Sequence, residues 1–249
     1  MKKHFISGLA LATLITSGTA AANFDLEDNY IGGSDPRDVI GTDSIFNTLG
    51  LNASISGSIL TVDIFTHFAG YADDGLYSSI TQTEASGWGN GIGYGDLFLA
   101  STSADGEWEY GFSLDNRWSS TGGSGELYLL NGANFLYSDD FISAGGYRNG
   151  YEVAVDTDAQ AVEQVGGGSW SVNEAEGIVS FALELEGTGL PYGDGFTFGW
   201  GMTCANDVIK GTVEMDNNTV DVPEPGALGL VGLGLLGTIF GRRRKKLSS

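Results

Sequence analysis

Aspartates on short polar segments are the residues of this chain best suited to chemistry. Carboxylates on loops supply the hard oxygen ligands that calcium prefers. The candidate ligands are Asp73, Asp74, Asp139, Asp140, Asp156 and Asp158. The stretch 156–164 lacks the glycine and the closing glutamate of an EF-hand loop, so a calcium ion would need an irregular site. A solvated acidic surface accounts for the same residues, and the sequence therefore predicts no cofactor, with calcium as the candidate exception.

Nucleophilic and zinc chemistry have few residues to use. His67 is the one histidine beyond His4, and a Ser-His-Asp or Cys-His system would depend on it. No Gly-x-Ser-x-Gly elbow is present. We interpret His67 as a strand residue near a sheet edge. Cys204, the single cysteine, excludes an intrachain disulfide and is interpreted as a small buried hydrophobe. One cysteine and one histidine cannot supply the usual zinc ligands.

Paired carboxylates raise the possibility of glycoside hydrolysis, which needs two of them across a cleft. Glu107 and Glu109, or Glu184 and Glu186, lie two apart and would share one strand face. Such pairs arise by chance among 32 acidic residues, and the Glu-x-Asp-x-x-Glu pattern of one sandwich-fold hydrolase family is absent. The sequence therefore favours a non-enzymatic protein, with a glycoside hydrolase as a distant alternative.

Aromatic residues in Gly- or Ser-rich segments are candidates for stacking on sugar rings. They are Trp88, Tyr94, Trp118 and Tyr192. Covering the ends of the core is the competing interpretation. A lectin-like module that binds glycans, with or without calcium, is therefore the main alternative to a structural role.

The charge distribution excludes nucleic acid as a partner. All 32 acidic residues lie between Asp25 and Glu224, whereas most of the 11 basic residues lie at the two ends. A strongly acidic surface repels phosphate backbones. It suits solubility, cations and neutral partners such as glycans.

The N-terminus predicts a cleavable secretory signal over residues 1–22. Lys2 and Lys3 precede an apolar run over 5–15, and small residues of the A-x-A type follow. Ala20 and Ala22 place the cleavage after Ala22, so the mature chain would begin at Asn23. A retained membrane anchor is the alternative, but the apolar run is short for a span.

The C-terminus has three ordered parts. Pro223, Glu224 and Pro225 precede an uncharged apolar run over 226–240. A basic cluster closes the chain, formed by Arg242, Arg243, Arg244, Lys245 and Lys246. As a helix the apolar run is roughly 22 Å long, marginal for a hydrocarbon core of ~30 Å unless the basic side chains extend it by snorkelling. Basic residues mark the cytoplasmic end of a span, so the acidic region would lie outside the inner membrane.

This order of Pro-Glu-Pro, apolar segment and basic cluster resembles the PEP-CTERM sorting domain. In that family an exosortase, a membrane cysteine transpeptidase-like protease, recognises the tail in bacteria that make exopolysaccharide. The resemblance, over residues 223–249, implies transit through the inner membrane, removal of the tail, and release or attachment at the cell surface. A plain single-span anchor is the alternative. Segments 95–99 and 200–211, and Phe141 together with residues 148–153, also resemble parts of PEP-CTERM surface proteins.

The intervening region, 23–215, predicts one domain of short antiparallel strands, followed by a polar tether over 216–222. Apolar and polar residues alternate most clearly from Trp108 to Asp115. Strands are predicted at 58–68, 96–100, 108–115, 126–130, 150–155, 178–185, 196–204 and 208–215. Residues 23–50 are predicted to be irregular and 87–95 to form a loop. The frequent turn residues favour an antiparallel β-sandwich of jelly-roll type, with a signal helix and a transmembrane helix at the two ends.

Together these features predict an exported surface or exopolysaccharide-matrix protein, of the kind found in biofilms, with a structural or adhesive role. Its expected partners are the Sec export machinery, an exosortase and, as a candidate, exopolysaccharide.

Overall fold

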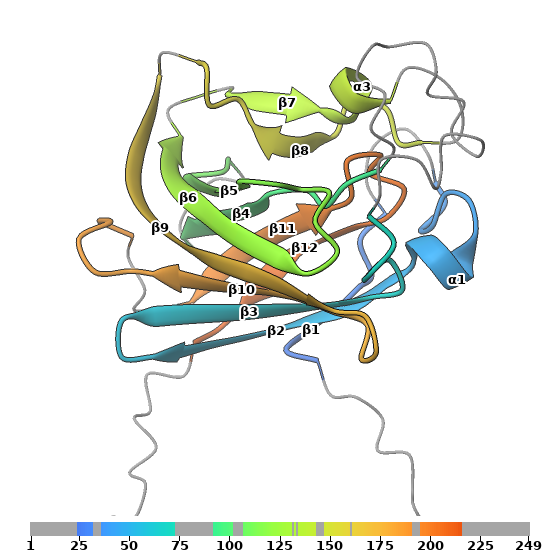
Figure 1. The fold of residues 1–249 in the computed structure, drawn as a ribbon, viewed down its shortest axis with the longest axis horizontal. Helices are drawn as coiled ribbons and strands as arrows, with labels where there is room; N and C mark the ends of the chain where they lie inside the picture. Colours follow the sequence, from blue (N-terminus) through green and yellow to red (C-terminus); the bar gives the residue numbers. More distant parts are fainter. Residues whose placement is uncertain are drawn as a thin grey trace, which may run out of the picture.

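The computed structural model describes residues 24–31, 36–72, 92–101, 107–130, 132, 134–142, 147–159, 161–190 and 195–215. In these residues ten strands form one antiparallel sheet in the order β1-β2-β3-β10-β9-β6-β5-β4-β11-β12, and β7 pairs with β8 (Figure 1). The strands are Leu26–Glu27 (β1), Thr48–Ser56 (β2), Ile59–Thr66 (β3), Leu97–Ser101 (β4), Tyr110–Leu114 (β5), Gly122–Leu130 (β6), Phe135–Tyr137 (β7), Glu152–Val155 (β8), Val162–Asn173 (β9), Ile178–Glu184 (β10), Phe196–Gly201 (β11) and Val208–Val213 (β12).

The two edge strands of the large sheet, β1 and β12, lie against each other, so the sheet is nearly closed. Leu26 of β1 covers Gly211 of β12, where an added Cβ would lie 2.6 Å from Leu26 Cδ1. We call this contact between β1 and β12 the seam. The all-β, antiparallel prediction is confirmed. The jelly-roll subtype is not confirmed, because the ten strands form one continuous sheet.

Strand β9 is what makes the sheet continuous. It pairs with β6 over residues 162–171 and with β10 over its second half, 168–173. Its three glycines and a register shift opposite Leu127 and Tyr128 allow the bend that this double pairing requires. At Gly168 an added Cβ would lie 2.1 Å from the Ala182 carbonyl oxygen, so only glycine fits. Glycine has low strand propensity, which is why the sequence predicted no strand here.

The main core follows the alternation that the sequence predicted. In β3 and β10 the alternate apolar residues are fully buried and face one another in register, as Leu60 with Leu183, Val62 with Phe181, and Ile64 with Val179. Burying each such side chain contributes about 1.5–3 kcal/mol. The predicted hairpin of β11 and β12 is also present.

A second, smaller core lies on the other face of β4. Leu97 and Leu99 point into the main core, whereas Phe98 and Ala100 pack with Trp108 in the second one. The β7–β8 pair covers this face (Figure 1). Strand β4 is therefore buried on both faces, which explains its uninterrupted apolar sequence.

Several further elements depart from the sequence prediction. Residues 23–50 were predicted to be irregular, but β1, the start of β2 and the short helix α1 (Asp43–Phe46) fall there. Helix α3 (Ser138–Phe141) is equally short. One helical turn gives no periodicity to detect, and the two-residue β1 exists only because it pairs with β2.

The predicted signal helix, the polar tether and the transmembrane helix lie outside the described residues. In the part of the chain that the structure describes, no helix has the length and apolar character to cross a membrane.

Candidate functional site

Three aspartates from distant parts of the chain meet at the end of the sheet near the seam. Asp28 follows β1, Asp38 lies between β1 and α1, and Asp207 lies in the turn from β11 to β12. Each offers a carboxylate oxygen, and these oxygens lie within 4.8 Å of one another. We call these residues the aspartate triad. Oxygen atoms at this spacing are able to contact one metal ion together.

Asp207 is the fixed member of the aspartate triad. Its side chain is fully buried, and its Oδ2 accepts a hydrogen bond from the backbone N–H of Thr48 at 2.6 Å. Its Oδ1 accepts from the N–H of Val208 at 2.9 Å. The sequence predicted a turn at Asn206 and Asp207, which is confirmed, and the turn holds β12 in register with β11.

The pKa values in the aspartate triad reflect buried like charges. Burial, then the charge of Asp207, raises the pKa of Asp28 to about 8. Burial, and further the charge of Asp38, raises the pKa of Asp207 to about 6, against the two backbone hydrogen bonds that lower it. Neutral pH therefore favours a positive species, a proton or a cation, between these carboxylates.

Several oxygens around the aspartate triad have no hydrogen-bond donor. They are Asp28 Oδ2, Asp38 Oδ1, Thr48 Oγ1 and Asn206 Oδ1, all of them buried atoms. An unsatisfied buried polar group costs about 1–3 kcal/mol. Four such atoms therefore lie on the aspartate triad and on two buried residues that adjoin it, Thr48 and Asn206.

Arg148 holds the segment that carries Asp38. The guanidinium is 1% exposed and donates from Nη2 to the carbonyl oxygens of Arg37 at 3.1 Å and Asp38 at 2.8 Å. Its Nε donates to the Ala205 carbonyl at 3.2 Å. Ala205 adopts a left-handed φ of 48°, which turns the chain just before Asp207. One side chain thus positions two of the segments that form the aspartate triad.

A second buried polar network joins strands β4, β5 and β8. Asp96 is fully buried and accepts from the backbone N–H groups of Leu114 at 3.0 Å and Val155 at 2.8 Å. Arg117 forms an ion pair with it at 3.2 Å and also donates to the Tyr94 carbonyl. Asp96 therefore connects the start of β4 to the ends of β5 and β8.

The aspartates that the sequence proposed as calcium ligands are used locally where the structure describes them. Asp139 Oδ1 accepts from Gly150 N–H at 2.9 Å, and Asp140 Oδ2 accepts from Tyr137 N–H at the start of α3 at 2.7 Å. Asp156 Oδ1 accepts from the N–H of Asp158 at 3.2 Å. Among the described residues these four belong to no group of three potential ligands. Asp73 and Asp74 lie outside the described residues.

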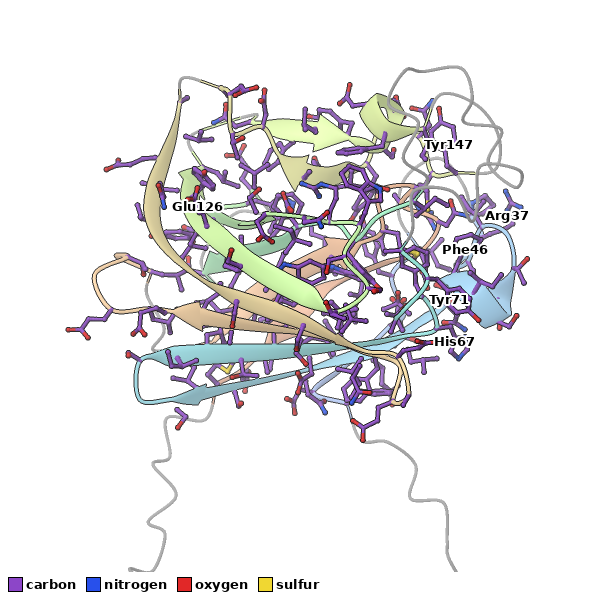
Figure 2. All side chains as sticks on the ribbon, viewed as in Figure 1. Arg37, Phe46, His67, Tyr71, Glu126 and Tyr147 are labelled. Atoms are coloured by element: carbon purple, nitrogen blue, oxygen red, sulfur yellow. The ribbon has the colours of Figure 1, made fainter. Side chains whose placement is uncertain are left out.

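The candidate catalytic residues have structural contacts. His67 lies beside α1, near Phe46 (Figure 2), where its exposed Nδ1 is 2.9 Å from the Asp43 carbonyl oxygen. Glu109 accepts from Ser101 N–H at 2.6 Å, and Glu184 accepts from the Ser58 hydroxyl. Figure 2 also shows Glu126 on β6, well away from α1, where it accepts from the Tyr128 hydroxyl.

Cys204 is fully buried, as predicted, and burial raises the pKa of its thiol to about 12. We expect the native protein to resist alkylation, because at pH 8 only about one thiol in ten thousand would be ionised. Intact-mass measurement after iodoacetamide treatment should show labelling only in concentrated guanidinium chloride. Rapid stoichiometric labelling of the native protein would contradict this expectation.

The proposed sugar-stacking residues receive no support where they are described. Tyr94 is a core residue with no exposed surface, packed edge-on against Phe68 and Trp170, so this part of the prediction is wrong. Trp118 is only partly exposed, and its Nε1 is buried. Trp88 and Tyr192 lie outside the described residues.

The three internal segments that resemble parts of PEP-CTERM surface proteins contact one another. The Trp200 indole N–H donates to the Gly95 carbonyl at 3.1 Å. The backbone N–H of Asp96 donates to the Val153 carbonyl at 2.9 Å, and Arg148 reaches Ala205 as described above. Direct hydrogen bonds therefore link segments 95–99, 148–153 and 200–211, and the last of these contains Asp207.

Sequence reasoning missed the aspartate triad because its members are far apart in the chain. Asp28 and Asp38 stand in a stretch with no strand pattern, and only Asp207 lies in a predicted turn. Basic residues stand close to two of the three, with Arg37 next to Asp38 and Lys210 three positions after Asp207, so the sequence carries no charge signal that locates the site.

Comparison with known proteins covers the C-terminal tail. No curated protein and no solved structure matches the chain. A family model described as the PEP-CTERM protein-sorting motif matches residues 221–245. The match spans Pro223, Glu224 and Pro225, the apolar run and four of the five basic residues. The C-terminal segment of this chain is therefore a PEP-CTERM protein-sorting motif, as the order of its parts predicted.

Proposed function

We propose that this chain is an exported protein of the cell surface or exopolysaccharide matrix, processed by an exosortase, with a structural or adhesive role and no enzymatic activity. The observation that carries the proposal is the sorting motif at 221–245, which implies exosortase processing and surface targeting. Export through the Sec machinery, guided by residues 1–22, and passage of the tail through the inner membrane complete the route.

The described domain supports a structural role. Its buried polar groups, Asp96, Arg117 and Arg148, tie strands and loops together. Its one described histidine is engaged at Nδ1 with a backbone carbonyl. A structural role is preferred to glycan binding because Tyr94, a proposed stacking residue, lies in the core.

Processing of the tail leaves a defined mass signature. Lys210 and Arg242 are consecutive trypsin sites, so the intact chain yields one peptide spanning residues 211–242. In the surface pool we expect this peptide to be absent and to be replaced by a shorter one that begins at Gly211 and ends within or close to the Pro-Glu-Pro motif. Mass spectrometry of surface and inner-membrane fractions checks this.

A matched pair of variants tests the motif itself. Glu224→Ala should retain the 211–242 peptide and accumulate in the inner membrane, whereas Glu214→Ala, at an exposed glutamate outside the motif, should be processed normally. An intact tail in the surface pool of the unmodified protein would overturn the sorting proposal.

Loss of cell aggregation on deletion of the chain is expected for an adhesive role, whereas saturable binding to one sugar on a glycan array would favour the lectin alternative.

A further inference from the structure

We propose that Asp28, Asp38 and Asp207 bind one calcium ion, and that this ion holds the seam of the sheet closed. The inference concerns the folded domain and is independent of how the tail is processed.

The spacing of the carboxylates fits a single calcium ion. Calcium–oxygen bonds of 2.3–2.6 Å allow two oxygens on one ion to lie up to about 5 Å apart. The three carboxylate oxygens lie within 4.8 Å of one another. Asp207 is held in place by its two backbone hydrogen bonds, so one ligand is positioned before the ion arrives.

A buried hydroxyl with no partner provides an independent indication of a ligand. Thr48 is 1% exposed, and its Oγ1 makes no hydrogen bond. The backbone N–H of the same residue donates to Asp207 Oδ2 at 2.6 Å, so this hydroxyl belongs to a residue that directly contacts the aspartate triad. Asn206, 2% exposed, likewise has an unpartnered Oδ1.

Two carboxylate oxygens of the aspartate triad are buried without a partner. Asp28 Oδ2 and Asp38 Oδ1 are buried and without a donor. The buried ion pair of Arg117 is with Asp96. Arg148 uses its Nη2 on the main-chain oxygens of Arg37 and Asp38.

The chemistry of the ligands selects calcium among common metals. Every candidate atom is a carboxylate, hydroxyl or amide oxygen, which suits a hard cation and not zinc. Magnesium requires near-ideal octahedral geometry at shorter distances, whereas three carboxylates on separate segments offer the variable geometry that calcium accepts.

The position of the site gives the ion a structural role. Asp28 directly follows β1, and Asp207 directly precedes β12, the two strands that meet at the seam. Without the ion, the short β1 is held to the large sheet through two residue pairs with β2. Calcium therefore links the N-terminal segment to the last hairpin of the sheet.

Direct binding is tested on the full-length chain after treatment with a chelator. Terbium ion, a luminescent substitute for calcium, should bind and be displaced by calcium, since Tyr30 lies two residues from Asp28 and is able to sensitise it. At a calcium concentration about a hundredfold above Kd, the melting temperature should rise by about 5–10 °C. Magnesium should bind about tenfold more weakly or worse. Equal stabilisation by magnesium would overturn the assignment to calcium.

Charge-matched variants locate the site. Asp28→Asn and Asp38→Asn should each weaken calcium binding by about tenfold or more, because each removes one carboxylate ligand. Asp158→Asn, an exposed aspartate outside the aspartate triad, should bind like the unmodified chain. Asp207 is left unchanged because its backbone hydrogen bonds have a separate role in folding. No calcium-dependent rise in melting temperature up to millimolar calcium, or equal affinities in all three variants, would overturn the proposal.

Discussion

Replacing Asp96 with asparagine is expected to lower the free energy of unfolding by about 3–5 kcal/mol, the range for breaking a buried ion pair from one side. Arg117 would keep a buried charge without its counterion, because its side chain is only 10% exposed. The backbone N–H groups of Leu114 and Val155, which now donate to separate carboxylate oxygens, would also compete for the single amide oxygen of asparagine. Urea unfolding of the full-length chain, followed by tryptophan fluorescence, measures the loss.

Two comparisons distinguish this ion pair from a general charge effect. Asp158→Asn removes the same charge at an exposed site and should change the stability by less than about 0.5 kcal/mol. Adding Arg117→Met to Asp96→Asn should restore part of the loss, because the uncompensated charge is then gone. If Asp96→Asn is as stable as Asp158→Asn, Asp96 does not hold β4, β5 and β8 together.

Replacing Arg148 with methionine is the second change with a large expected effect, a loss of about 3 kcal/mol or more. The substitution fills a similar volume but leaves the carbonyl oxygens of Arg37, Asp38 and Ala205 without their buried donor. Arg148→Lys should recover little of the lost stability. A single ammonium group does not reproduce the planar guanidinium, which donates to the 37–38 segment and to Ala205 at once. The same urea titration measures both variants.

Arg148 also positions Asp38, so its loss should have a second effect. Arg148→Met should weaken calcium binding along with stability, because the 37–38 segment is no longer held opposite Asp207. Lys210→Met is the control. It removes one positive charge and a contact with the Trp108 ring at 4.5 Å, worth about 0.5–1 kcal/mol, and should leave calcium binding unchanged. A stable Arg148→Met protein with unaltered calcium affinity would contradict both expectations.

Sequence and structure agree where the pattern is local and differ where it is not. Alternation in β3, β5 and β10 predicted the strands and the buried face, since side chains of a strand alternate regardless of what it pairs with. Strand β9 was missed because Gly166, Gly167 and Gly168 replace the β-branched residues that signal a strand. These glycines allow β9 to approach β10 closely. The need for this close approach comes from the partner strand and not from the local sequence.

The candidate site shows the same division. The aspartates that look like ligands in the sequence form the close pairs 139/140 and 156/158, and Asp140 accepts from a backbone N–H at the start of α3 and Asp156 from one in its own turn. Residues close in sequence readily satisfy one another's backbone groups. Asp28, Asp38 and Asp207 have no such local use for their free oxygens, and the fold brings them together across nearly the whole domain.

The sequence by itself determined the all-β class, the buried face of the regular strands, the burial of Cys204 and the sorting motif at 221–245. Each is encoded in consecutive residues, as an alternation or an ordered motif, and so is readable without contacts. Only the tertiary structure decided the strand order, the seam between β1 and β12, the role of Arg148 and the aspartate triad. These depend on contacts between segments that are not neighbours in the sequence, such as Leu26 with Gly211, which arise from the packing of the whole sheet and leave no local trace.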